Sequence, residues 1–291
     1  MKVINVGKLV FADGHMHSNP VKGLGIAGIG RKFLDNGGWF IVLVSLPPHH
    51  LDLENSFDGY VKSFDVFISE CRKARELKLK TVCLLGIHPA AIEDEVSRDP
   101  KRSVKVLDKA IMVVNYIAKL VKEGLVNGFG EIGRPHYRAI PEAFIVNNMV
   151  TRYTLELARD LDAIVHLHLE QGGELTALDI ENLVKSIGID RAKIVLHHLD
   201  VATAKASQKR DLVFTVPGKY PVLREVFTSI KPFYMVESDF IDDPKRPGVS
   251  SYPWDIVENQ KKLLTEGVID EEYLYKLNID TVVKIYRVEP P

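Results

Sequence analysis

Short apolar runs and longer segments of helical periodicity alternate along the chain. Eight of the apolar runs are mostly continuous, which is typical of strands buried on both faces of a parallel sheet. They cover residues 9–12, 39–46, 81–85, 126–129, 163–165, 193–196, 212–216 and 233–236. Apolar side chains recur at helical spacing between these runs, which predicts helices, most clearly over residues 64–79, 104–124, 141–161 and 252–286.

Strand–helix alternation, repeated eight times, predicts one (β/α)8 barrel, a TIM barrel, as a single domain over residues 1–291. No linker, low-complexity tract or block of charge divides the chain. An open, doubly wound sheet is the structural alternative. It usually has fewer strands, and no glycine-rich phosphate-binding fingerprint follows the first strand.

The composition narrows the class of protein further. Hydrophobic residues make up 46% and charged residues 26%, as in ordinary soluble domains. The net charge of −1 gives no chain-wide attraction to nucleic acid, although a local basic rim is compatible with it. Cys71 and Cys83 are the only cysteines and predict no disulfide framework. Residues 1–10 lack a signal-peptide pattern, and no apolar run is long enough to span a membrane. We therefore expect a cytoplasmic protein without a membrane partner.

Metal-binding residue types follow several of the predicted strands. Since the carboxyl ends of barrel strands converge on one face, these side chains should meet there. They are His15 and His17 after the first strand, His88 after the third, Glu131 after the fourth, His166 and His168 after the fifth, His197 and His198 after the sixth, and Asp239 after the eighth.

These residue types suit a hydrolytic metal centre. Imidazoles with carboxylates favour Zn, Mn, Fe, Co or Ni over Ca or Mg alone. Glu131 has two oxygens and can bridge two ions, which would lower the pKa of a water molecule between them. Asp239 could bind one ion and orient or deprotonate that water.

Each residue taken alone also has a structural explanation. The His15–His17 pair is a weak motif by itself, His88 could be a hydrogen-bonded structural residue, and Glu131 could cap a turn. Neighbours on a strand point to opposite faces, so we expect His197 to be the ligand and His198 to be structural. His49 and His50 follow two prolines and are expected in an exposed loop. The hypothesis of a metal site therefore rests on the placement of all these residues together at strand ends.

The ordered segments resemble TatD-type metal-dependent deoxyribonucleases, which are amidohydrolase-like TIM barrels. Residues 130–133 match the family's G-E-I-G element outright. The other similar segments are residues 13–17 (D-x-H-x-H), 86–89 (G-x-H-P), 155–158 with 164–166 (a helix, then V-I-H), 195–197 (the start of H-C-F) and 237–239 (E-T-D).

The resemblance implies two divalent ions, with Zn expected first and Mn, Mg, Co, Ni or Fe as alternatives. His15, His17 and Asp239 would hold one ion, and His166 and His197 the second. Glu131 would bridge the two. His88 would help to bind a substrate phosphate.

The sequence departs from the family beside these ligands. Residues 134–137, 167–170 and 198–199 replace its usual Leu-Asp, x-Arg-Asp and Cys-Phe segments. We expect Arg134, His136 and His168 to contact substrate. Arg134 would either replace the missing phosphate-binding arginine or form a surface ion pair, and His168 could instead join the metal ligands. Glu237 could orient a ligating histidine.

Two enzymatic hypotheses follow. The candidate ligands resemble those of the family, whereas the residues beside them differ from the family's. The first is a phosphoester hydrolase, with an exonuclease acting on DNA 3′ ends as one form of it. The second is an amidohydrolase-type enzyme that cleaves a C–N bond or a lactone with the same centre. A non-catalytic metal-binding scaffold is the third hypothesis, which fits less well because every ligand position is filled.

Overall fold

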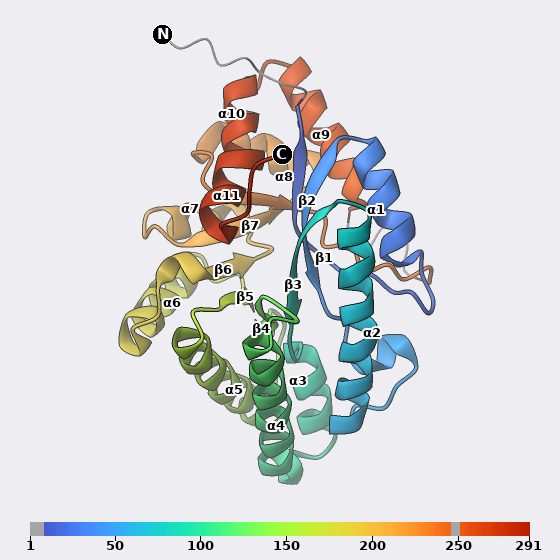
Figure 1. Ribbon diagram of the computed structural model, residues 1–291. Helices are drawn as coiled ribbons and strands as arrows, with labels where there is room; N and C mark the ends of the chain where they lie inside the picture. The colour runs from blue at the N-terminus through green and yellow to red at the C-terminus, as the bar shows by residue number, and fades with distance from the viewer. Residues whose placement is uncertain (1–8, 246–250) are drawn as a thin grey trace.

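The structure is a computed structural model and describes residues 9–245 and 251–291. Eight parallel strands lie side by side in chain order and form a nearly closed barrel with helices around it (Figure 1). The strands are β1 Phe11–Met16, β2 Gly38–Val44, β3 Lys80–Leu85, β4 Gly128–Gly133, β5 Ile164–His168, β6 Ile194–His197, β7 Val213–Pro217 and β8 Met235–Glu237. This is the predicted TIM barrel, and the doubly wound alternative is wrong.

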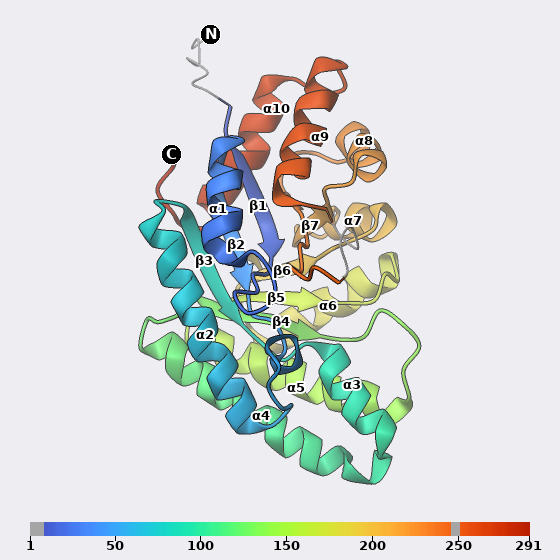
Figure 2. The same cartoon turned by 90° about the vertical axis from the view of Figure 1, so that its right-hand side faces the viewer.

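Helices cover the outside of the barrel on all sides, as the two perpendicular views show (Figure 2). They are α1 Gly25–Asp35, α2 Phe57–Glu76, α3 Pro89–Arg98, α4 Ser103–Lys122, α5 Pro141–Asp160, α6 Glu174–Ile187, α7 Val201–Gln208, α8 Tyr220–Ser229, α9 Pro253–Thr265, α10 Glu271–Tyr275 and α11 Thr281–Tyr286. Short turns of helix are η1 Pro48–Leu51, η2 Pro100–Arg102, η3 Arg191–Lys193 and the π-helical η4 Lys276–Asp280.

Local sequence sets several of these boundaries. The Ser56 side chain accepts a hydrogen bond from the backbone of Gly59 and so begins α2 earlier than its apolar pattern suggested. Pro141 occupies the first turn of α5, where its missing N–H costs nothing. Gly267 has a φ of +70°, which only glycine adopts readily, and it separates α9 from α10.

Six strands continue past their predicted ends. β1, β4, β5, β6 and β8 thereby include His15, Glu131, His168, His197 and Glu237, and β7 ends one residue later than predicted. The physical reason is that these polar side chains point into the barrel and are buried among one another. The candidate ligands therefore lie mostly within the last residues of the strands, which hold them more rigidly than loops would.

Two apolar layers hold the barrel together. The larger lies between the strands and the surrounding helices. The smaller fills the barrel near the amino ends of the strands, where Phe40 and Trp39 pack with Val282 and Tyr286 of α11. The indole N–H of Trp39 donates to the backbone oxygen of Asn278, 2.9 Å away. The C-terminal helices thus close one end of the barrel.

The two cysteines correct one prediction. Cys71 of α2 and Cys83 of β3 are both buried and pair as a disulfide, with Cα atoms 6.4 Å apart. The sequence suggested no such bridge, because packing of α2 against β3 brings together positions that no cysteine pattern marks. Within the described ranges, no helix is long and apolar enough to cross a membrane. Residues 1–8, part of the segment examined for a signal peptide, lie outside the described residues.

Candidate metal centre

The histidines of β1 point into the barrel at its carboxyl end. His15 and His17 are both buried. The Nδ1 of His17 lies 2.9 Å from the backbone oxygen of Val44, which leaves Nε2 facing the Oε1 atom of Glu131 at 3.5 Å. The Nε2 of His15 lies 3.9 Å from the same oxygen. One carboxylate oxygen therefore has both β1 imidazoles beside it.

The two oxygens of Glu131 face different sets of histidines. Oε1 also has the Nε2 of His88 at 3.7 Å. Oε2 lies 2.7 Å from the Nδ1 of His168 and 3.5 Å from the Nε2 of His197. A Cβ at Gly86 would collide with the backbone oxygen of Glu131, so the close approach of β3 and β4 here requires glycine. Glu131 therefore stands between the β1 pair and the histidines of β5 and β6.

Carboxylates of β8 and the residues after it complete the group. The Glu237 carboxylate accepts from the Nδ1 of His197 at 2.8 Å, the orienting contact expected of it, so Nε2 of His197 is free to face Glu131. The Oδ1 of Asp239 lies 3.9 Å from His197 Nε2 and 4.0 Å from His17 Nε2. The backbone N–H of Asp239 donates to the His15 oxygen at 2.9 Å, which joins the segment after β8 to β1.

The structure does not bring His166 into this group. Its Nε2 lies 2.8 Å from the Tyr286 hydroxyl and its Nδ1 lies 3.2 Å from the Nδ1 of His15. His168 is two residues further along the same face of β5, in register with His197 of β6. The resemblance pointed to the first histidine after the apolar run, whereas the extra length of β5 makes His168 the one that reaches Glu131.

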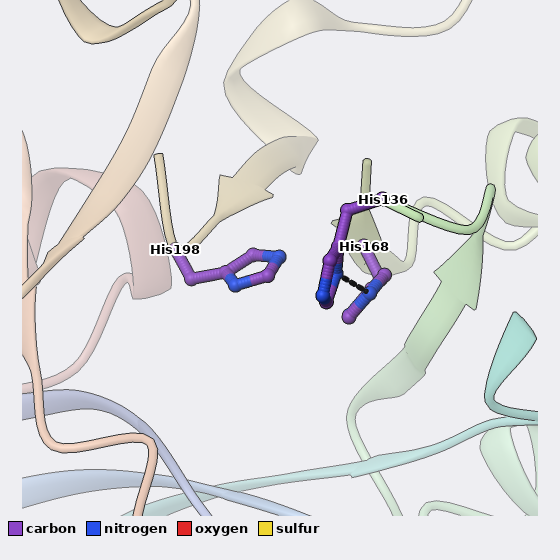
Figure 3. Close-up of side chains that lie close together, drawn as sticks. All are labelled: His136, His168 and His198. Atoms are coloured by element: carbon purple, nitrogen blue, oxygen red, sulfur yellow. Dashed lines mark hydrogen bonds between the residues drawn. The ribbon is translucent and has the colours of Figure 1, made fainter. Parts of the chain in front are cut away.

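His198 is a second departure from the sequence prediction. Its φ of +52° turns the backbone out of the extended form immediately after β6. The rule that neighbouring strand residues point to opposite faces therefore does not apply to His197 and His198. The His198 ring stacks on that of His197, with the ring centroids 4.3 Å apart. His198 also lies beside His136 and His168, which face one another in Figure 3 with 2.7 Å between His136 Nδ1 and His168 Nε2.

Other predicted site residues have definite partners as well. The Nδ1 of His88 accepts from the backbone N–H of Ala90 at the start of α3. The Arg134 guanidinium is buried between two carboxylates, with two hydrogen bonds to Glu170 (2.9 and 2.7 Å) and one to Asp179 (2.5 Å). Arg134 therefore forms an ion pair, the second of the two roles that its sequence position allowed. His49 and His50 lie on η1 rather than in an irregular loop, and His49 is exposed.

Burial lowers the pKa values of several histidines of the site, which favours the neutral form that has a lone pair for a metal. It lowers the pKa of His88 and His198 to about 3 and lowers that of His17. Burial opposes ionisation of Glu131, but the surrounding histidines and the hydrogen bond from His168 hold its pKa well below the ordinary value. Burial, followed by the charge of Glu131, raises the pKa of Asp239 well above its ordinary value.

The group has the features of a site built for cations. Within the described chain, the Nε2 of His15 and the Oε1 of Glu237 are buried and lack any hydrogen-bond partner. Leaving such atoms unpaired costs free energy that a bound ion can recover. Four groups of three potential ligands lie here, each with its ligand atoms within 4.8 Å of one another: His15–His17–Glu131, His15–His197–Glu237, His88–Glu131–His168 and His197–His198–Asp239. The donor set of imidazoles and carboxylates fits divalent transition metals.

Sequence reasoning missed three contributors to the site. Tyr286 comes from the last helix and gave no local signal for its contact with His166. Lys219 precedes α8 and lies near Asp239. Its positive charge lowers the pKa of the Asp239 carboxyl and so opposes the effect of burial. Asp13 is fully buried and accepts from the backbone and side chain of Ser238 at 2.9 and 2.5 Å, so it joins β1 to the residues after β8. Its place in the D-x-H-x-H segment was the one available signal.

Comparison with known proteins shows the family and the fold. The family described as TatD related DNase matches residues 12–287. An uncharacterised protein of Methanocaldococcus jannaschii is 27% identical over 282 residues, which cover 97% of each chain. Among solved structures, a TatD homologue of Escherichia coli aligns with a TM-score of 0.67 at 15% identity, covering 96% of this chain and 98% of that one. A TatD-like protein of Archaeoglobus fulgidus aligns with a TM-score of 0.64 at 17% identity, covering 96% and 100%.

Proposed function

Because the chain belongs to the family of TatD-related DNases, and is therefore placed among metal-dependent hydrolases, we propose that it cleaves phosphoester bonds. The candidate substrate is the end of a DNA strand. The observation that carries the proposal is the position of Glu131, whose two oxygens face separate histidine sets. A bridging carboxylate between two divalent ions needs this arrangement.

The residues divide into two ligand sets on this proposal. His15, His17 and Oε1 of Glu131 would hold one ion, with Asp239 beside it. His168, His197 and Oε2 of Glu131 would hold the other. His168 thus takes the place that the sequence gave to His166. Bound ions of this kind lower the pKa of a water molecule and stabilise charge on a departing oxygen.

The surrounding side chains supply positioning and proton transfer. Glu237 fixes the ring of His197 through its Nδ1–H, so that Nε2 keeps its lone pair. Asp239 would be the proton acceptor for the attacking water, because its Oδ1 lies 4.0 Å from His17 Nε2 and 3.9 Å from His197 Nε2, beside the proposed ions. Its side chain is 33% exposed, so a substrate can reach it. His88 and Lys219 are the groups placed to contact a substrate phosphate.

The ion pairs that Arg134 forms favour a second function. Its guanidinium is held by Glu170 and Asp179 and does not present a free charge to an anion. A site with fewer free cations suits a less charged substrate, such as a lactone or a cyclic amide. The same activated water attacks a carbonyl carbon, so this alternative uses the same centre.

The test compares both substrate classes in one protein preparation. Chelator-treated protein is reloaded with Zn²⁺ or Mn²⁺ and assayed on bis(p-nitrophenyl) phosphate and on a 5′-labelled single-stranded oligonucleotide. A panel of lactones and cyclic amides is run in parallel. We expect metal-dependent release of nitrophenol and of nucleotides, lost in Glu131→Gln and retained in Glu123→Gln, a surface control. Turnover of lactones or amides alone would select the second function, and no turnover of phosphoesters with any metal would overturn the first.

A further inference from the structure

We propose that His136, His168 and His198 form an additional metal site at the rim of the barrel, distinct from the ions around Glu131. The three rings come from the carboxyl ends of three consecutive strands, β4, β5 and β6. Their centroids are 4.7, 4.5 and 5.1 Å apart for the pairs 136–168, 168–198 and 136–198 (Figure 3). One nitrogen of each ring lies within 4.8 Å of the others.

The two ring nitrogens of His168 face the two sites. The Nδ1 of His168 faces Glu131 Oε2 at 2.7 Å, and its Nε2 faces His136 Nδ1 at 2.7 Å. A neutral imidazole has one lone pair for a metal. With the inner ion on Nδ1 and the rim ion on Nε2, His168 would therefore give up its N–H proton to solvent and bridge the two ions as an imidazolate.

The backbone at His198 gives independent support. His198 has a φ of +52°, in the left-handed region, and its ring lies beside those of His136 and His168. Without that turn the side chain would point away from His197 and out of the group. The Nε2 of His198 is buried and lacks a hydrogen-bond partner in the described chain, so it is available to a ligand.

The chemistry of the donor set selects the ion. Three imidazoles without a carboxylate favour Zn²⁺, Co²⁺ or Cu²⁺ over Mg²⁺ or Ca²⁺. His136 is exposed, His198 half-buried and His168 buried, so the fourth position of a tetrahedral ion would face solvent and accept a substrate oxygen. His168 offers one nitrogen to this site and the other to Glu131, so the two sites are adjacent. The proposal does not depend on which bond the enzyme cleaves.

The test measures Zn²⁺ bound per full-length chain, by metal analysis and by calorimetric titration. His198→Asn keeps a residue that tolerates the left-handed backbone, and His136→Gln changes an exposed side chain. Each should bind about one Zn²⁺ fewer than the wild type, because a three-imidazole site loses a ligand. His49→Gln, at an exposed histidine of η1, should bind as the wild type does.

The outcomes separate this proposal from the proposed function. Rim variants that bind as many Zn²⁺ ions as the wild type, with the same affinity, would overturn the rim site and leave the centre at Glu131 standing. Rim variants that lose all bound Zn²⁺ would also overturn it, because the rim ion would then not be distinct. Glu131→Gln should lose the inner ions and keep about one at the rim. A Glu131→Gln protein with unchanged Zn²⁺ content, together with the expected loss in the rim variants, would support the rim site and contradict the inner centre.

Discussion

The same eight strands carry two different environments at the two ends of the barrel. Near their amino ends, Phe40 and Val82 pack with Tyr286 of the C-terminal helix in an apolar layer. At their carboxyl ends, buried imidazoles and carboxylates face one another, and within the described residues His15 Nε2, Glu237 Oε1 and His198 Nε2 have no hydrogen-bond partner. A bound cation could satisfy such atoms, whereas the apolar layer at the amino ends has no comparable set of ligands.

Two histidines of one strand show the boundary between the environments. His166 is bonded to Tyr286 and so belongs with the closed end, while His168 is bonded to Glu131 and belongs with the open end. They share a residue type, a face of β5 and complete burial. Only the partner differs, so residue type and strand position are insufficient to identify a ligand.

Replacing the carboxylate between the two histidine sets should have the largest effect. Glu131→Gln removes the charge that binds both proposed ions while keeping the shape of the side chain. We expect hydrolytic activity to fall by at least about 10³-fold, since a metal centre supplies several kcal/mol of transition-state stabilisation. Steady-state rates and metal content are measured together. Full activity in this variant would remove Glu131 from the mechanism.

The paired variants His168→Asn and His166→Asn test the contrast within β5 directly. His168→Asn should weaken metal binding by at least about 100-fold, because a ligand is removed. His166→Asn should keep its metal but lose about 1–3 kcal/mol of unfolding free energy, because the buried Tyr286 hydroxyl loses its partner. Metal titration and urea unfolding are run on both. The reverse pattern would restore His166 as the ligand of β5.

Replacing Glu237, which accepts from the Nδ1 of His197, should have a smaller effect. Glu237→Gln leaves a group that can still accept from His197 Nδ1 but no longer bears a charge. We expect metal affinity to fall by about 10–100-fold, the usual cost of changing such a supporting partner. Asp160→Asn, on the exposed end of α5, is the control. An unchanged affinity would show that Glu237 does not support His197 in metal binding.

We expect the smallest effect on the pH dependence of the free energy of unfolding of the metal-free protein. The pKa values of His88, His166 and His198 are about 3, below their unfolded value of 6.5, so the unfolded chain takes up protons first on acidification. Their contribution is present above about pH 6.5 and is lost as pH falls toward about 3. Four carboxyls with raised pKa values act in the opposite direction, namely Asp13 (raised to about 7), Glu237, Asp239 and Asp242. The histidines with lowered pKa values outnumber them.

Urea unfolding at about pH 7 and about pH 5, after chelator treatment, measures this dependence. The metal-free protein should be less stable at the lower pH, and the His198→Asn variant should show a shallower decline. A protein more stable at the lower pH would mean that the buried carboxyls, rather than the histidines, dominate the proton balance of folding.

The sequence predicted the barrel well because buried parallel strands leave continuous apolar runs, which are a local signal. It also predicted that His15, His17, Glu131, His197 and Asp239 would meet, because strand ends in a barrel converge. It did not reveal geometry that no local pattern records. The additional length of β5 places His168 rather than His166 beside Glu131, a single positive φ turns His198 inward, and the packing of α2 on β3 pairs Cys71 with Cys83.

The central claim is that the carboxyl end of the barrel holds divalent ions bridged by Glu131, and anomalous X-ray diffraction from crystals loaded with Zn²⁺ tests it most directly. We predict zinc peaks between Glu131 and the histidines on each side of it, namely His15 with His17 and His168 with His197. Zinc-loaded crystals with no anomalous peak beside Glu131, or with a peak only at His166, would contradict the account.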